Sequence, residues 1–456
     1  MKTHSFTLKS AMATLDAFTL ADRLAALDWL IAHGPADAAP KTAGGINLHA
    51  HSFFSYNMTG WSPTHIAWAS RQAGLFAAGL CDFDVLDGLD EFLQAGQMLG
   101  LRATVNLETR AFFPAYAELD INSPGEPGVA YIMGCGFFRA IRSGTPEATI
   151  LTAYRDQAKA RNIALAARIN AKLPEIAVDF DTDIAPLTPG GCPTERHMIR
   201  AYRLKAETRY GNGEALGEFW GKLFGTPGAE MPRLITDIPG FEEKIRAKLS
   251  KSGGLGYEKP TAKTFPPVSD FVRWVLACEA IPTTTWLDGT SGGEADMDLM
   301  LDRMGTLGAC ALNIIPDRNH NIADPKTRTL KVKKLDDVVC AAASRGLPIN
   351  IGTELNKDGQ PFVDDLNVEP LSAYRQIFLD SAHLFVGHTW LARYAGFSYT
   401  GKAADAEFGA NRKARNRLFQ AVGQLAPLTA DKAKQLEDMG PAKALSYLRD
   451  GAAATL

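Results

Sequence analysis

The sequence predicts an α/β protein built as a TIM-like barrel of parallel strands with a helical insertion. Short apolar segments alternate with helical ones from residue 46 to residue 108, which is typical of parallel strands joined by right-handed helical crossovers. Residues 190–265 interrupt this alternation with a segment rich in charge, glycine and proline, and the alternation resumes at residue 281. The carboxyl ends of the strands in such a barrel all lie on one face.

The first half of the chain contains well-delimited elements. An amphipathic helical segment at 10–33 precedes the first expected strand, 46–51. A helix then begins at Ser62, a favourable N-cap, with Pro63 in its first turn, and it ends at Gly74. The elements expected next are a strand at 76–82, a helix at 89–99, strands at 102–108 and 129–134, a helix at 147–160 and a strand at 162–168.

The second half of the chain completes the expected barrel. Helical stretches at 195–207 and 240–250 indicate that the inserted segment is helical. The strands expected beyond it are 281–287, 309–315, 348–353 and 383–388. The predicted organisation is an N-terminal helical segment (1–40), the first part of the barrel (41–189), the inserted helical subdomain (190–265), the remainder of the barrel (266–402) and C-terminal helices (403–456).

Composition indicates an ordinary soluble protein with a large core. The chain has 456 residues, of which 46% are apolar and 22% are charged. A net charge of −3 gives no reason to expect nucleic acid or an acidic membrane surface as a partner. No 18-residue apolar run or signal-peptide pattern is present, and the six cysteines are scattered. We therefore expect a cytoplasmic protein with reduced cysteines and no membrane partner, and the oligomeric state stays open.

Two histidines, His49 and His51, close the first expected strand. Side chains at i and i+2 of an extended chain point the same way, so both imidazoles can reach one point beyond the strand. This geometry suits two nitrogen ligands of one borderline metal ion. The pattern alone is weak in a chain with nine histidines, because such residues often only fill the end of a strand.

Polar side chains also follow the other expected strands. These residues are Asp82 and Asp84, Glu108, Asp288, the run Asp317-Arg318-Asn319, Glu354 and His388. Because the carboxyl ends of parallel barrel strands share one face, these side chains are expected to gather there. Polar residues are common at the ends of strands in any protein, so their position alone does not indicate a function. The indication comes from the types of residue found there.

The segment 48–108 resembles the PHP superfamily, the polymerase-and-histidinol-phosphatase type of metal hydrolase. The matching segments are His49-Ala50-His51-Ser52, Ser62-Pro63, the run from Cys81 to Leu89 and Asn106-Leu107-Glu108. Residues 194–201, which include His197, resemble the family's segment at the mouth of its helical insertion, and 352–356 stand where the family has G-S-D-x-H. The resemblance implies a distorted (β/α)7 barrel and metal-dependent hydrolysis, most often of phosphate esters.

The sequence departs from the family at several ligand positions. Tyr56 stands in place of an aspartate, and Phe83 and Tyr131 stand in place of histidines. These replacements remove ligands for a two- or three-metal cluster. The resemblance therefore implies a single divalent transition metal, Zn²⁺, Mn²⁺ or Fe²⁺. Its implied ligands are His49, His51, Glu108 and Glu354.

These observations favour a metal-dependent hydrolase of a small anionic substrate, with a phosphate ester as the substrate that the resemblance implies. The metal would activate a water molecule and polarise the scissile group. Arg318 is the main candidate anion anchor, because a guanidinium presents a planar fork of donors. The candidate proton acceptors are Asp82, His197 and Asp288, and the other candidate substrate-binding residues are Asn319, Arg200, His388 and Asn356.

Two alternatives stay open on the sequence alone. A metal-dependent isomerase, epimerase or lyase of a sugar or sugar acid could use the same residues to abstract a proton beside a carbonyl. A degenerate, non-catalytic barrel would keep the fold and bind a ligand or partner instead. A metal assay separates this last alternative from the enzymes, and turnover of p-nitrophenyl phosphate separates the hydrolase from the isomerase.

Overall fold

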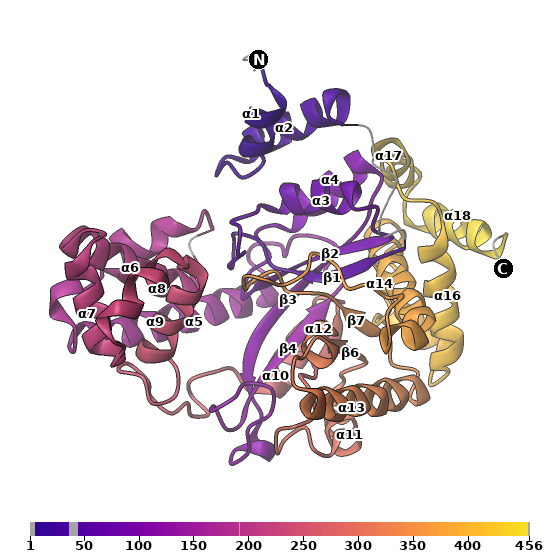
Figure 1. The fold of residues 1–456 in the computed structure, drawn as a ribbon. Helices are drawn as coiled ribbons and strands as arrows, with labels where there is room; N and C mark the ends of the chain where they lie inside the picture. Colours follow the sequence, from indigo (N-terminus) through magenta and orange to yellow (C-terminus); the bar gives the residue numbers. More distant parts are fainter. Residues whose placement is uncertain (1–4, 36–43, 191, 455–456) are drawn as a thin grey trace.

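The computed structural model describes residues 5–35, 44–190 and 192–454. Seven strands form one sheet in the order β1 to β7, and a bridge between Ala50 and Glu354 brings its two edges together. The sheet is therefore a nearly closed barrel surrounded by helices (Figure 1), a mixed α/β architecture that is consistent with a TIM-like barrel. The domain boundary expected after residue 40 lies outside the described residues.

The strands lie where they were expected, but one of them runs in the opposite direction. Two further segments that were expected to be strands are not strands. Their bounds are β1 Ile46–Ala50, β2 Ala77–Phe83, β3 Arg102–Phe112, β4 Val129–Cys135, β5 Ile281–Thr285, β6 Ala311–Ile314 and β7 Ile349–Ile351. Strand β4 runs antiparallel to both β3 and β5, so the uniformly parallel sheet was a wrong expectation. The chain between β3 and β4 contains only a short 3-10 turn, Pro114–Tyr116, and no helix to carry it back across the sheet.

Two of the expected strands are helical. Residues 162–168 lie within the 25-residue helix α5 (Pro146–Asn170), and 383–388 lie within α14 (Arg375–Ala395). Short apolar runs cannot be assigned to strand or helix by periodicity alone. Helix α14 is buried on most sides, so its apolar residues lack the polar face that would have revealed a helix.

The remaining helices outside the lobe surround the sheet or pack on the helices that surround it. Around the sheet lie α3 (Pro63–Gln72), α4 (Leu89–Leu99), α10 (Val268–Ala277), α11 (Met297–Leu307), α12 (Asp317–His320) and α13 (Pro325–Ser344). The N-terminal helices are α1 (Leu8–Thr14) and α2 (Leu20–His33), and the C-terminal ones are α15 (Lys402–Phe408), α16 (Arg412–Gln424), α17 (Ala430–Met439) and α18 (Pro441–Ala453). None of the described helices combines the length and apolarity that a membrane span requires.

A helical lobe projects from the barrel (Figure 1) and has a hydrophobic core of its own. Its helices are the C-terminal half of α5 with α6 (Glu195–Tyr210), α7 (Glu214–Phe224), α8 (Met231–Thr236) and α9 (Ile238–Leu249). Ile169 and Ile184 belong to this core, so the lobe draws on residues before the expected start at 190. Trp220 and Phe241 are fully buried at its centre.

Strand β1 is held in place by two close backbone approaches. A Cβ atom at Gly79 would lie 2.6 Å from the carbonyl oxygen of Leu48, and one at Gly352 would lie 2.4 Å from the backbone nitrogen of His49. Both distances are too short for any real side chain. The barrel can therefore close beside His49 only because glycine stands at these two positions.

We expect Gly352→Ala to destabilise the protein by about 1–3 kcal/mol, the usual cost of overpacking a tight core, and to displace His49. Gly305→Ala is the matched control, because a Cβ atom there meets nothing within 4 Å and the residue lies inside helix α11. Urea unfolding compares the two variants. Equal stability of both variants would show that the barrel closure tolerates a side chain at 352.

Candidate active site

Three side chains from two strands meet at the mouth of the barrel. His49 lies in β1, His51 directly follows it, and Glu108 lies in β3. Nε2 of His49 is 3.4 Å and Nε2 of His51 is 3.5 Å from the same carboxylate oxygen of Glu108. All three side chains are buried, and one ligand atom from each lies within 4.8 Å of the others.

The other ring nitrogen of each histidine is held by a neighbour. Nδ1 of His49 lies 3.2 Å from the side-chain oxygen of Asn313, and Nδ1 of His51 lies 3.3 Å from the hydroxyl of Ser55. The Ser55 hydroxyl in turn donates to Asp82 at 2.7 Å. When Nδ1 carries the proton and donates it to these oxygens, the lone pair of Nε2 faces Glu108. This is the tautomer that a histidine metal ligand requires.

Both Nε2 atoms are buried and have no hydrogen-bond partner among the described residues. Two unpartnered imidazole nitrogens beside one carboxylate form a mixed nitrogen and oxygen donor set that suits a divalent transition metal. The residues present therefore fit the expected cofactor, although they do not identify the metal.

Charge interactions tie the three groups together. Burial alone would raise the pKa of Glu108, but the two imidazoles outweigh it and lower that pKa to about 2. Burial alone would lower the pKa of His49, yet Glu108 and Glu354 outweigh it and raise that pKa. The cluster therefore favours the ionised form of the Glu108 carboxylate next to a positive charge. A metal ion would supply such a charge.

Glu354, the fourth expected ligand, lies beside this group and not within it. Its carboxylate forms an ion pair with Arg318 and accepts a hydrogen bond of 3.1 Å from Gln360. Two backbone hydrogen bonds join Glu354 to the chain on both sides of Ala50. The carbonyl oxygen of Glu354 accepts from the amide of His51, and the amide of Glu354 donates to the carbonyl oxygen of His49. Glu354 adopts a left-handed backbone with φ of 64°, a conformation rare outside glycine that often marks functional sites.

Aromatic rings stand at Tyr56, Phe83 and Tyr131, the positions where the resemblance to the PHP superfamily led us to look for further ligands. Phe83 stacks on His51 with a centroid distance of 5.1 Å, and Tyr131 packs edge-on against Phe83. Tyr56 packs against His197 and accepts a hydrogen bond from Arg200. These rings form part of the cavity wall around the histidines, and Phe83 has no atom that can coordinate a metal.

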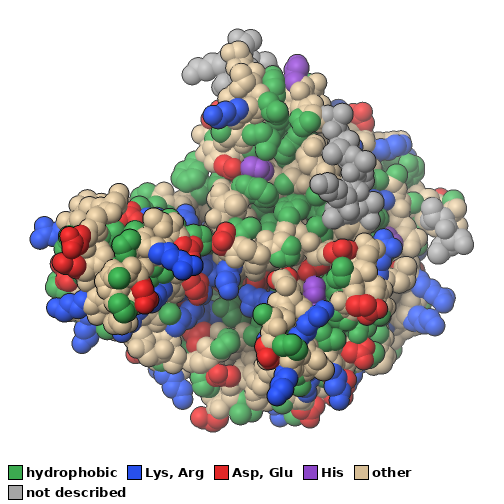
Figure 2. Space-filling model, in the orientation of Figure 1, with side chains coloured by type: hydrophobic (Ala, Val, Ile, Leu, Met, Phe, Trp, Pro, Cys, Tyr) green, Lys and Arg blue, Asp and Glu red, His purple; other side chains and the backbone are tan. Residues whose placement is uncertain are grey.

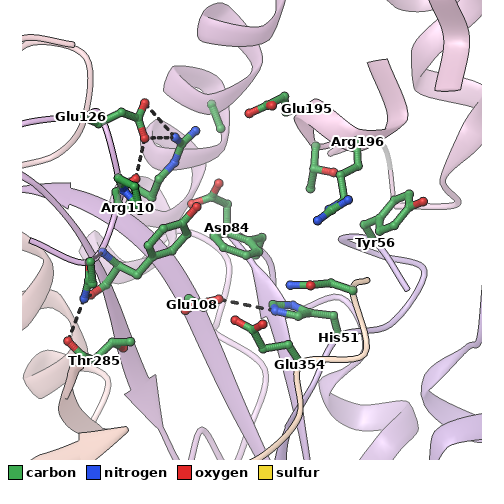
Figure 3. Close-up of a pocket in the computed structure, with 18 of the residues that line it drawn as sticks. His51, Tyr56, Asp84, Glu108, Arg110, Glu126, Glu195, Arg196, Thr285 and Glu354 are labelled. Carbon is green, nitrogen blue, oxygen red and sulfur yellow. Dashed lines mark hydrogen bonds and ion pairs between the residues drawn. The ribbon is translucent and has the colours of Figure 1, made fainter. Parts of the chain in front are cut away.

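A cavity of about 500 Å³ lies between the barrel mouth and the helical lobe. His51, Glu108 and Glu354 line it on the barrel side (Figure 3), where a dashed line joins Glu108 to His51. Its basic lining residues are Arg110, Arg161, Arg196, Arg246, Lys251 and Arg318, and its acidic ones are Asp84, Glu108, Glu126, Glu195 and Glu354. Figure 2 shows basic side chains around the hollow between lobe and barrel.

Of the residues predicted to bind substrate, Arg318 and Asn356 line the cavity. Arg200 instead pairs with Glu242 and donates to the Tyr56 hydroxyl. Asn319 is buried and donates to the carbonyl oxygens of Leu287 and Ile315. It therefore fixes α12 to the barrel and is not among the lining residues.

His388 is not brought to the cavity, because it lies in helix α14 and not at a strand end. Its ring is fully buried and both nitrogens are engaged, Nε2 with the carbonyl of Gly136 and Nδ1 with the backbone amide of Tyr399. Burial lowers its pKa to about 4. The ring therefore links three segments of the core.

The three predicted proton acceptors also lie away from the cavity lining. Asp82 sits behind His51 and accepts from Ser52 and Ser55. His197 completes the N-cap of α6, where Nδ1 accepts from the Thr194 amide, and burial with Arg200 lowers its pKa to about 3. Asp288 forms an ion pair of 2.7 Å with Lys331.

Several lining residues were not predicted. Arg110 lies two residues after Glu108 on β3, so the alternation of a strand could have placed it on the same face. Arg161 from α5, Arg246 from α9 and Lys251 reach the cavity from the lobe. No local pattern in the sequence connects these three to the barrel, because their meeting depends on how the lobe docks.

The contacts behind the histidines lead to a prediction about metal affinity. Asp82→Asn and Ser55→Ala are each expected to weaken divalent-metal binding by about 10–100-fold, because they loosen the hydrogen bonds that orient His51. The matched control is Asp87→Asn, whose carboxylate pairs with Arg155. Competition with a chromogenic chelator measures the affinities. Unchanged affinity in both variants would exclude this orienting role.

No protein-family model and no curated protein matches the sequence. Solved structures that are similar to the chain in fold include two with low sequence identity. One is a protein of Bifidobacterium adolescentis provisionally assigned as a metal-dependent phosphoesterase, with 15% identity and a TM-score of 0.46. The other is an amidohydrolase of Chromobacterium violaceum with bound sulfate and no metal, with 16% identity and a TM-score of 0.48. Each match covers 73% of this chain and 96% of the other chain.

Proposed function

We propose that the protein is a metal-dependent hydrolase of a small anionic substrate, with a phosphate ester as the leading class. The observation that carries this proposal is the pair of buried, unpartnered Nε2 atoms facing Glu108, a residue that lines the cavity together with His51. His49, His51 and Glu108 would hold one divalent transition metal. Such an ion lowers the pKa of water and polarises the scissile group.

The charge of the cavity supports an anionic substrate. Six basic and five acidic side chains line it, and ion pairs compensate most of both: Glu126 with Arg110, Glu195 with Arg246 and Lys251, Glu354 with Arg318, and Glu243 with Arg196. Arg161 is the least well paired, because its contact with Asp84 spans 3.9 Å and burial lowers its pKa to about 10. An anion in the cavity would offset this cost of burying positive charge.

We propose Asp84 as the proton acceptor. It replaces Asp82, His197 and Asp288, the candidates that the sequence suggested for this role. It follows β2, lines the cavity and has a pKa raised by burial. A raised pKa brings a carboxylate closer to the range in which it takes and returns protons at neutral pH. Asp82 would act only through Ser55, by positioning His51.

The test is turnover of p-nitrophenyl phosphate and of its diester by protein loaded with Zn²⁺ or Mn²⁺. Release of p-nitrophenol that requires added metal supports the hydrolase, and Asp84→Asn should then lower kcat while metal content stays unchanged. Tight metal binding without turnover of either ester, but with conversion of a sugar phosphate into its isomer, would favour the isomerase alternative. Failure to bind metal at all would favour the non-catalytic barrel.

A further inference from the structure

A second group of metal-capable side chains lies outside the triad of His49, His51 and Glu108. Asp317 and His320 stand three residues apart in the short helix α12, and Asp364 lies in the loop after β7. One ligand atom from each of the three lies within 4.8 Å of the others. Two segments distant in the sequence thus direct two carboxylates and one imidazole at a common point.

Asp364 is the member that ordinary packing does not explain. It is 3% exposed, and neither carboxylate oxygen has a hydrogen-bond partner of ordinary geometry among the described residues. Burial and the nearby carboxylate of Asp317 raise its pKa to about 8, while the Asp317 backbone amide lowers it only in part. Buried carboxylates are otherwise almost always paired or bound to metal.

His320 also has an unpartnered polar atom. Its Nε2 atom is buried and has no hydrogen-bond partner among the described residues. The carboxylates of Asp317 and Asp364 lie close together and repel each other when both are ionised, unless positive charge lies between them. A divalent cation would satisfy both carboxylates and the imidazole at once, with a donor set of the kind that Zn²⁺ and Mn²⁺ accept.

We propose that Asp317, His320 and Asp364 bind a second divalent cation, separate from the one at the barrel mouth. This proposal does not depend on the proposed function. Arg318 lies between Asp317 and His320, and Glu354, the partner of Arg318, stands near the start of the loop that carries Asp364. The cation would therefore fasten α12 to this loop and hold the ion pair of Arg318 and Glu354 at the cavity.

Equilibrium dialysis of metal-free protein against Zn²⁺, followed by metal analysis, tests the proposal. We expect two equivalents in the unchanged protein, one in Asp364→Asn and one in the double variant His49→Ala with His51→Ala. The triple variant should bind none. Asp365→Asn is the matched control, because Asp365 is the exposed neighbouring carboxylate and should leave two equivalents.

Thermal unfolding gives an independent measurement on the same second site. In the double histidine variant, added Zn²⁺ should still raise the unfolding temperature, and adding Asp364→Asn should remove that rise. His320→Ala, at a partly exposed position, serves if Asp364→Asn fails to fold. The proposal is overturned if both Asp364→Asn and His320→Ala bind as much Zn²⁺ as the unchanged protein, or if all Zn²⁺ is lost with His49 and His51.

Discussion

Replacing both His49 and His51 with alanine is expected to abolish metal binding at the barrel mouth and to lower kcat/KM by about 10³-fold or more. The physical reason is that two of the three converging donors disappear, and Glu108 alone cannot hold a transition metal tightly. A metal ion contributes several kcal/mol of transition-state stabilisation, and each 1.36 kcal/mol is about tenfold in rate. Metal analysis after dialysis and steady-state kinetics give the two values.

The control for this change is His33→Ala, which removes an exposed histidine at the end of α2 and should alter neither value. Glu108→Gln is a second, isosteric change of the same site and should give the same loss. Thermal unfolding checks that each variant is folded. A folded double variant that retains the metal of the barrel mouth would refute the ligand assignment.

Removing the guanidinium of Arg318 is the change with the next largest expected effect. Nη2 of Arg318 pairs with Glu354, and its other nitrogens have no hydrogen bond among the described residues. The side chain is 41% exposed and lines the cavity, so a substrate anion can reach it. We expect Arg318→Ala to weaken binding of an anionic substrate by about 10- to 150-fold, the loss of about 1.5–3 kcal/mol from a charge-assisted hydrogen bond.

Arg318→Lys should weaken binding almost as much, because an ammonium cannot make a bidentate contact with an anion and hold Glu354 in the same geometry. Inorganic phosphate as a competitive inhibitor provides the measurement, with its inhibition constant compared across variants. Arg209→Ala, at an exposed position of α6, is the control with the same change of charge. An unchanged inhibition constant in Arg318→Ala would mean that Arg318 only supports Glu354.

The sequence was most informative where local geometry decides the structure. The i and i+2 spacing of His49 and His51 predicted their convergence, and Ser62 with Pro63 predicted the start of α3, which the structure confirms. Periodicity failed for 383–388, because a helix buried on most sides has no polar stripe. It also could not reveal that β4 is antiparallel, since strand direction depends on the connection and not on the strand.

The site could be predicted only as far as the barrel determines it. Glu108 was expected at the end of its strand and Arg318 just after a strand, and the ends of such strands share one face, so their place at the cavity follows from the fold class. Arg246 and Lys251 come from the lobe and reach the cavity only through its tertiary docking. His197 lies outside the cavity lining for a different reason, since a histidine three residues after Thr194 is also suited to cap a helix.

The measurement that tests the central claim most directly is an anomalous-difference electron-density map of crystals grown with Zn²⁺ or Mn²⁺, recorded at the absorption edge of the metal. The account predicts a peak among Nε2 of His49, Nε2 of His51 and the Glu108 carboxylate, at about 2.0–2.2 Å from each donor for Zn²⁺. A fully loaded crystal with no peak at that position would contradict the account.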